Sequence, residues 1–89
     1  MKKGIKAKVI GKVQGVWFRK YTKQKADELG LKGFVRNEPD GSVYVEAEGD
    51  LYALRIFREW LYIGSPQSIV ENVEIEEMPY KGYEDFRIL

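Results

Sequence analysis

The 89-residue sequence contains no cysteine and no histidine. Without cysteine, the chain has no disulfide framework, no thiolate nucleophile and no cysteine metal site. Without histidine, it also lacks the most common general base and the most common metal ligand. Any catalysis therefore depends on arginine, amides, carboxylates, hydroxyls or the backbone. We expect neither a metal site nor a cofactor.

Long hydrophobic runs are also missing. No apolar stretch is long enough to span a bilayer, and the N-terminus lacks the apolar segment of a signal peptide. We therefore expect a cytoplasmic protein that does not bind membranes. The length suits one small domain covering residues 1–89, and no exposed apolar stripe indicates more than a monomer. Abundant lysine and glutamate also favour a thermophilic source.

The formal net charge of +1 is distributed unevenly. The first 26 residues carry nine Lys and Arg and no acid, whereas all fourteen acids lie from Asp27 onward. A one-sided positive field of this kind attracts small anions. Lysines that simply face solvent explain the same pattern, so both interpretations remain open.

Hydrophobic periodicity and turn residues divide the chain into seven elements. The expected strands cover residues 5–9, 33–37, 42–48, 70–77 and 86–89, and the expected helices cover about 17–29 and 51–63. Gly30 is the expected cap of the first helix, and Asp50 is the expected N-cap of the second. The order βαββαβ plus a terminal strand predicts an α+β, ferredoxin-like sandwich. Its mainly antiparallel sheet carries two helices on one face. This fold by itself does not specify a function.

The segment from Gly11 to Arg19 is the most informative for function. It places a glycine-containing turn between a strand and a helix, where several backbone N–H groups can point at one anion. Gly15 allows the backbone to approach that anion closely. Arg19 lies near the start of the helix, and its planar guanidinium fits two phosphate oxygens. The pattern has the makeup of a phosphate cradle, and the alternative, which spacing alone makes the more common case, is a surface arginine in a weak salt bridge.

Asn37 ends the second predicted strand. Asparagine at such a place commonly supports the turn through a side-chain hydrogen bond. The alternative is a site residue near Arg19, which needs a proximity that the sequence does not show. Trp17 and Phe18 beside lysines also resemble a base-stacking pair. Phe18 fits the core stripe of the helix, however, so we do not expect nucleic-acid binding.

The remaining polar clusters are expected to face solvent. Asp27-Glu28 and the carboxylates of residues 74–77 have no histidine beside them, which excludes a metal site of the usual kind. Tyr80 and Tyr83 fall in a polar loop before the last strand, and we expect both to be exposed.

Two segments resemble the signatures of the acylphosphatase family. The first runs from Val9 to Arg19 (VIGKVQGVWFR), and the second runs from Gly33 to Val43 (GFVRNEPDGSV). The segment around Gly64-Ser65-Pro66 and the closing YEDFRI at residues 83–88 resemble further parts of the family pattern. The resemblance covers almost the whole chain.

This resemblance implies metal-free hydrolysis of acyl phosphates to a carboxylate and inorganic phosphate. The family's phosphate-binding arginine falls on Arg19, and its water-orienting asparagine falls on Asn37. Its cradle of backbone N–H groups falls on residues 15–19. The implied substrate-binding residues are therefore Gly15, Val16, Trp17 and Phe18, with a small acyl phosphate as the partner.

Three positions depart from the family pattern. Trp17 is large where the family often has a small residue, which raises the question of substrate access. Tyr21 and Glu38 also stand where other residues are common, and Glu38 adds a negative charge beside Asn37. Two alternatives stay open. One is the related domain that begins hydrogenase-maturation carbamoyltransferases, and the other is a non-catalytic anion- or RNA-binding module.

Overall fold

A computed structural model describes residues 1–89 as five strands and two helices. The elements in chain order are β1 (Lys2–Lys12), α1 (Phe18–Glu28), β2 (Lys32–Asn37), β3 (Val43–Asp50), α2 (Leu51–Ile63), β4 (Ile69–Met78) and β5 (Phe86–Ile88). None of the helices is both long and apolar enough to cross a membrane.

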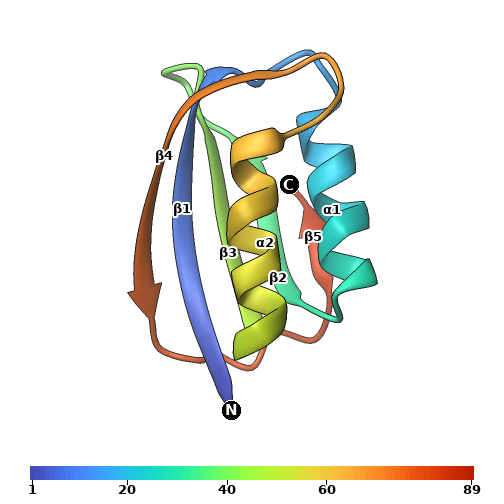
Figure 1. Ribbon diagram of the computed structural model, residues 1–89, viewed down its shortest axis with the longest axis vertical. Helices are drawn as coiled ribbons and strands as arrows, with labels where there is room; N and C mark the ends of the chain where they lie inside the picture. Colours follow the sequence, from blue (N-terminus) through green and yellow to red (C-terminus); the bar gives the residue numbers. More distant parts are fainter.

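The strands form one sheet with the order β4-β1-β3-β2-β5. β1 pairs antiparallel with both β3 and β4, and β2 pairs antiparallel with β3, while β5 joins the edge parallel to β2. Both helices lie against one face of this sheet (Figure 1). The expected ferredoxin-like α+β sandwich is therefore confirmed.

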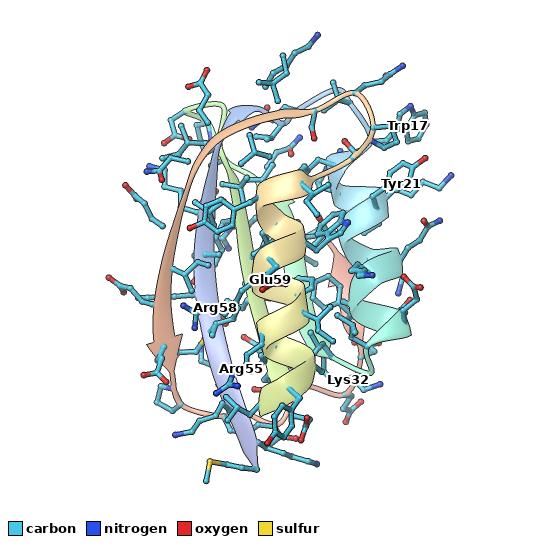
Figure 2. The ribbon with its side chains drawn as sticks, in the orientation of Figure 1. Trp17, Tyr21, Lys32, Arg55, Arg58 and Glu59 are labelled. Atoms are coloured by element: carbon cyan, nitrogen blue, oxygen red, sulfur yellow. The ribbon has the colours of Figure 1, made fainter.

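The core fills the space between the sheet and the two helices. Every second residue of the central strands points toward the helices, because successive strand side chains alternate between the two faces. The charged residues of α2 point away from the sheet, as Arg55, Arg58 and Glu59 show in Figure 2. The largest fully buried apolar side chains are Phe18, Phe57, Phe86, Leu31, Leu54 and Leu61.

The helix ends follow their capping residues. α1 ends in a Schellman motif, in which the Leu31 N–H donates to the Ala26 carbonyl and the Gly30 N–H donates to the Asp27 carbonyl. Gly30 has the left-handed φ of 70° that this motif needs. At the start of α2, the Asp50 carboxylate accepts from the Tyr52 N–H at 3.0 Å, as expected of an N-cap.

Most element boundaries differ from those expected by one to three residues, and the differences at β1 and at the start of α1 are informative. The first strand covers Lys2–Lys12 rather than residues 5–9, because β3 and β4 flank it and pair with it well beyond its apolar centre. α1 begins at Phe18 rather than Trp17. The reason is the left-handed conformation of Trp17, with φ 64° and ψ 18°, which no α-helical residue adopts.

Four of the eight lysines among the first 26 residues pair with later acids. Lys8 Nζ lies 2.9 Å from an Asp40 carboxylate oxygen, and Lys6 Nζ lies 3.3 Å from Glu76. These exposed pairs favour the interpretation in which the lysines line solvent, and each contributes little to stability. Arg19 forms no ion pair with a carboxylate side chain.

The face of the sheet opposite the helices carries a buried polar network. The Glu48 carboxylate is fully buried and accepts the backbone N–H groups of Lys81 and Tyr83, both at 2.6 Å. The neighbouring Glu46 carboxylate accepts the hydroxyls of Tyr44 and Tyr83 and the Lys81 ammonium. The expectation that Tyr83 is exposed is therefore wrong, because Tyr83 is half-buried against the sheet. Its hydroxyl and backbone fasten the loop before β5 to the sheet.

Four pKa shifts arise in this network, and one of them is the raised pKa of Lys81, whose ammonium donates to the Glu46 carboxylate. Burial raises the pKa of Tyr44 and Tyr83, and the hydrogen bonds to the Glu46 carboxylate raise both further. Burial also raises the pKa of Glu46, but the hydrogen bonds from Tyr44, Tyr83 and Lys81 outweigh it and leave the pKa below its ordinary value.

These shifts predict how the free energy of unfolding depends on pH. The raised tyrosine pKa values give a stabilisation that is fully present below the unfolded pKa of about 10 and is lost as the pH rises through the folded values. The lowered Glu46 pKa gives a stabilisation present above its unfolded value of about 4.3 and lost as the pH falls through the folded one.

Replacing Tyr83 by phenylalanine tests the predicted loss of unfolding free energy at high pH. We expect Tyr83→Phe to lower the free energy of unfolding by about 1 kcal/mol at pH 7. The deficit relative to wild type should shrink above pH 10, because Tyr83 ionises in unfolded wild type before it ionises in the folded protein, and the variant has no such group. Urea titrations from pH 7 to 11 measure this. Tyr80→Phe, in the same loop but without a hydroxyl hydrogen bond, is the matched control. A deficit that stays constant with pH contradicts the assignment.

Candidate active site

The turn between β1 and α1 presents backbone donors that have no acceptor. The N–H groups from Gly15 to Lys20 donate to no other group of the protein, and the first helical bond is that from the Tyr21 N–H to the Trp17 carbonyl. α1 has neither a side-chain N-cap nor an acid in its first turn. Such a helix start carries a partial positive charge and suits an anion.

Two left-handed residues shape this turn. Gly15 has φ 73° and Trp17 has φ 64°. A Cβ added at Gly15 would meet no atom within 4 Å, so the space beside this residue is open. Glycine adopts a positive φ without strain, whereas a bulky side chain does so only where the surroundings hold it. The turn is therefore built around two conformations that an ordinary loop avoids.

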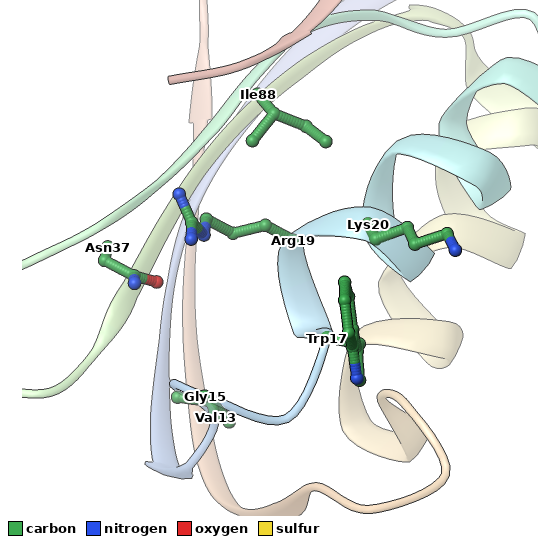
Figure 3. A pocket seen from close by; sticks show the side chains of 7 residues that line it. All are labelled: Val13, Gly15, Trp17, Arg19, Lys20, Asn37 and Ile88. Atoms are coloured by element: carbon green, nitrogen blue, oxygen red, sulfur yellow. The ribbon is translucent and has the colours of Figure 1, made fainter.

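Arg19 and Asn37 meet this turn in one cavity of about 390 Å³. The side chain of Arg19 extends toward Asn37, and Trp17 stands on the opposite side of the same hollow (Figure 3). The residues that line the cavity are Val13, Gly15, Trp17, Arg19, Lys20, Asn37 and Ile88. The topology thus brings the two predicted site residues together, because the end of β2 lies near the start of α1.

Asn37 carries an unsatisfied polar atom. Its Oδ1 atom is buried and has no hydrogen-bond partner. Asn37 occupies the same face of β2 as the buried Val35, which is the face toward the helices. Its side chain does not support the following turn, contrary to the more common role of such an asparagine. The Asp40 carboxylate closes that turn instead, by accepting from the Ser42 N–H and hydroxyl.

Ser65 fixes the orientation of the peptide between Val16 and Trp17 from the buried side of the turn. Its hydroxyl donates to the Val16 carbonyl at 2.7 Å, and Ser65 is only 3% exposed. In a trans peptide the C=O and the following N–H point in opposite directions. Because Ser65 draws the Val16 carbonyl to one side, the Trp17 N–H points to the other. Gly64 makes this approach possible, since a Cβ there would lie 2.3 Å from Ser68 Oγ and 3.0 Å from Phe18.

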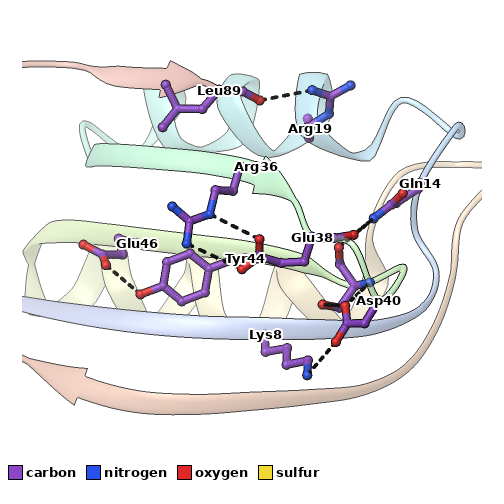
Figure 4. Close-up of polar contacts among 10 residues, drawn as sticks. Lys8, Gln14, Arg19, Arg36, Glu38, Asp40, Tyr44, Glu46 and Leu89 are labelled. Carbon is purple, nitrogen blue, oxygen red and sulfur yellow. Dashed lines mark hydrogen bonds and ion pairs between the residues drawn. The ribbon is translucent and has the colours of Figure 1, made fainter.

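Gln14 ties the same turn to the β2–β3 connection. Its side-chain amide donates to the carbonyl oxygens of Glu38 at 2.8 Å and Ser42 at 2.9 Å (Figure 4). Sequence reasoning missed Gln14 and the contact of Ser65. The only available signal was their place inside the family-like segments, because their partners lie 24 to 49 residues away.

The last strand positions Arg19. An Arg19 Nη1–H donates to the Leu89 oxygen at 3.2 Å (Figure 4). The Leu89 N–H in turn donates to the Val35 carbonyl, so β2 holds this end of the chain. Because a guanidinium carries five N–H donors, one bond to Leu89 leaves others available to a ligand.

The other predicted site residues contribute in different ways. The side chains of Val16 and Phe18 are buried in the core, so only their backbones face the site. The carboxylate of Glu38 pairs with Arg36 at 3.4 Å (Figure 4). This ion pair lies on the face of the sheet that carries Tyr44, so Glu38 does not place its charge in the cavity.

Comparison with known proteins agrees with this geometry. The acylphosphatase family model matches residues 5–88. An acylphosphatase of Thermotoga petrophila is 50% identical over 86 residues, which cover 97% of this chain and 96% of that protein.

Two solved structures are also similar. An acylphosphatase from Coxiella burnetii superposes with a TM-score of 0.96 at 43% identity, over 99% of this chain and 93% of that one. Full-length HypF, in a phosphate- and nucleotide-bound form, matches all of this chain with a TM-score of 0.88 at 27% identity, but over only 12% of its own length. The match of both sequence and structure over nearly the full length shows that the chain belongs to the acylphosphatase family.

Proposed function

We propose that this protein hydrolyses acyl phosphates to a carboxylate and inorganic phosphate, with Arg19 and Asn37 as its catalytic residues and no metal or cofactor. The observation that carries the proposal is the single cavity that holds Arg19, the unpaired donors of the β1–α1 turn and the orphaned Asn37 Oδ1. The family membership supports the reaction class. The lack of histidine and cysteine supports a mechanism built on hydrogen bonds.

The phosphoryl group is the part of the substrate that the cradle recognises. The N–H groups of residues 15–19 and the guanidinium of Arg19 would surround its nonbridging oxygens. Negative charge spreads over these oxygens in the transition state. Donors that are already oriented stabilise that charge more than they stabilise the ground state, and this difference lowers the barrier. The Ser65 and Gln14 hydrogen bonds supply the orientation.

Asn37 would orient the attacking water. Its Oδ1 accepts a hydrogen bond from that water, which satisfies the acceptor left without a partner in the free protein. The water oxygen attacks phosphorus as the bond between phosphorus and the acyl oxygen breaks. The carboxylate leaves, and the water proton passes to a phosphoryl oxygen of the substrate. Because a carboxylate is a good leaving group, this route needs no strong base.

A non-catalytic RNA-binding module is the competing function. Base-stacking sheets present aromatics and positive charge on the open face. Here Arg36 lies over the Tyr44 ring, 4.8 Å from its centroid, and the Tyr44 hydroxyl donates to Glu46. Lys6 and Lys8 on the same face pair with acidic side chains. The aromatic ring and these charges are therefore already engaged within the protein, which favours the small-molecule substrate over nucleic acid. A cytoplasmic monomer of a thermophile remains our expectation for the protein as a whole.

The reaction and the role of Arg19 are tested together with benzoyl phosphate in the presence of EDTA. We expect turnover that EDTA does not reduce. Arg19→Lys should lower kcat/KM by about 10²-fold or more. The lysine ammonium keeps the positive charge, but it cannot form the two parallel hydrogen bonds that a guanidinium forms with two phosphate oxygens. Arg58→Lys, on the outer side of α2, is the matched control and should retain wild-type activity. No turnover above background, or binding of RNA without hydrolysis, rejects the proposed function.

Asn37→Ala separates water orientation from phosphate binding. We expect kcat to fall by about 10²-fold while the inhibition constant of inorganic phosphate stays within about twofold, because Asn37 contacts the nucleophile rather than the phosphoryl oxygens. Asn72→Ala, an exposed asparagine of β4, serves as the comparison. Loss of phosphate inhibition in Asn37→Ala, with kcat retained, would assign this residue to binding instead.

Ser65→Ala tests the orientation of the cradle. Removing the hydroxyl frees the Val16 carbonyl, so the adjacent N–H groups lose their fixed direction. We expect kcat/KM to fall at least tenfold and phosphate inhibition to weaken in parallel. Ser68→Ala removes a hydroxyl from the same connection, where it donates to the Ser65 carbonyl, and should change neither value by more than about twofold. Equal effects of the two variants would show a general loosening of the connection.

A further inference from the structure

Trp17 is the one non-glycine residue of the chain with a positive φ. Its side chain is also 68% exposed, although indole is among the largest apolar surfaces a residue can present. Both features are unfavourable, because left-handed backbone strains a bulky residue and exposed apolar surface orders water. Glycine or asparagine would adopt the same backbone at lower cost. The fold of the turn therefore does not explain the indole.

Packing does not explain it either. Trp17 takes part in none of the aromatic pairs of the core, whereas its neighbour Phe18 packs against Trp60 at a centroid distance of 5.7 Å. The Trp17 ring makes one cation–π contact, with the Lys20 ammonium, which lies 5.4 Å from the ring centroid. This contact braces the ring at the surface, and it leaves the remaining ring surface free.

The free indole stands at the mouth of the phosphate site. Trp17 lines the same cavity as Arg19 and Asn37, on the side opposite Asn37 (Figure 3). Ile88, which is 43% exposed, and Val13 line the same cavity. Its volume of about 390 Å³ lies within the range of small-molecule pockets, about 300–1,000 Å³, and exceeds what a phosphate group alone fills. The cavity therefore combines cationic and polar groups with apolar side chains, and Ile88 and Trp17 lie to either side of Arg19 (Figure 3).

Resting on the proposed function, we propose that Trp17 and Ile88 form a subsite for the acyl group, which selects flat, apolar acyl phosphates such as aromatic ones. With the phosphoryl group in the cradle, the acyl group extends into the remainder of the same cavity. A planar apolar group covers the indole and the Ile88 side chain and removes both from water. A two-carbon acyl group is too small to cover both side chains. Trp17 thus widens the binding surface rather than blocking it.

The test compares an aromatic with a small aliphatic substrate. We expect the ratio of kcat/KM for benzoyl phosphate to that for acetyl phosphate to fall about tenfold in Trp17→Gly, and to fall in Ile88→Ala as well. The inhibition constant of inorganic phosphate should stay within about twofold, because the cradle contacts phosphate through backbone and Arg19. Glycine suits the left-handed φ, and Trp17→Asn provides a second variant that tolerates it. Tyr52→Ala, an exposed aromatic of α2, is the matched control.

Binding without turnover gives an independent measurement. Titration calorimetry with benzylphosphonate and methylphosphonate should show tighter binding of the aromatic ligand by wild type and a loss of that preference in Trp17→Gly. If wild type hydrolyses neither acyl phosphate, the proposed function fails and the subsite fails with it. If wild type hydrolyses both but the ratio and the phosphonate preference survive in Trp17→Gly, the acyl subsite alone is rejected. Retention by wild type of an RNA that Trp17→Gly no longer binds would assign the indole to base stacking and reject the subsite.

Discussion

The hydrogen bond from the Ser65 hydroxyl to the Val16 carbonyl is the contact on which the site most depends. Most helices satisfy their first N–H groups with a side-chain cap. α1 has no such cap, so its first donors and those of the preceding turn remain unpaired. The turn holds this unfavourable arrangement because Ser65 draws one carbonyl into the protein. The peptide plane then turns its N–H the other way, toward the cavity.

Distant tethers make this turn rigid. Gln14 binds it to the connection between β2 and β3, and Leu89 holds the side chain of Arg19 from the end of the sheet. None of these contacts is local, since their partners lie 24 to 70 residues apart. Donors held in this way need no reorganisation when charge develops on a ligand, and this is the main contribution that a preorganised site makes to catalysis.

The two faces of the sheet are connected through the last strand. On the open face, Glu46 and Glu48 fasten the loop of residues 79–85 by accepting its backbone and side-chain donors. That loop leads directly into β5, which carries Ile88 and Leu89 to the edge of the cavity. A polar network far from the site therefore determines where one wall of the cavity and the support of Arg19 lie.

The sequence by itself determined the order of the elements and which residue types are available for chemistry. Alternation in β1, the cap at Asp50 and glycine at residue 30 are local patterns, so the strands, helices and fold class could be predicted from them. The absence of histidine and cysteine, with Arg19 and Asn37 in family-like segments, limited the chemistry in the same way. Only the tertiary structure decided which groups meet. It placed Asn37 in the cavity of Arg19, buried Glu46 and Glu48, and left the Trp17 indole exposed at the site. These outcomes depend on packing between segments far apart in the chain, which periodicity along one segment does not encode.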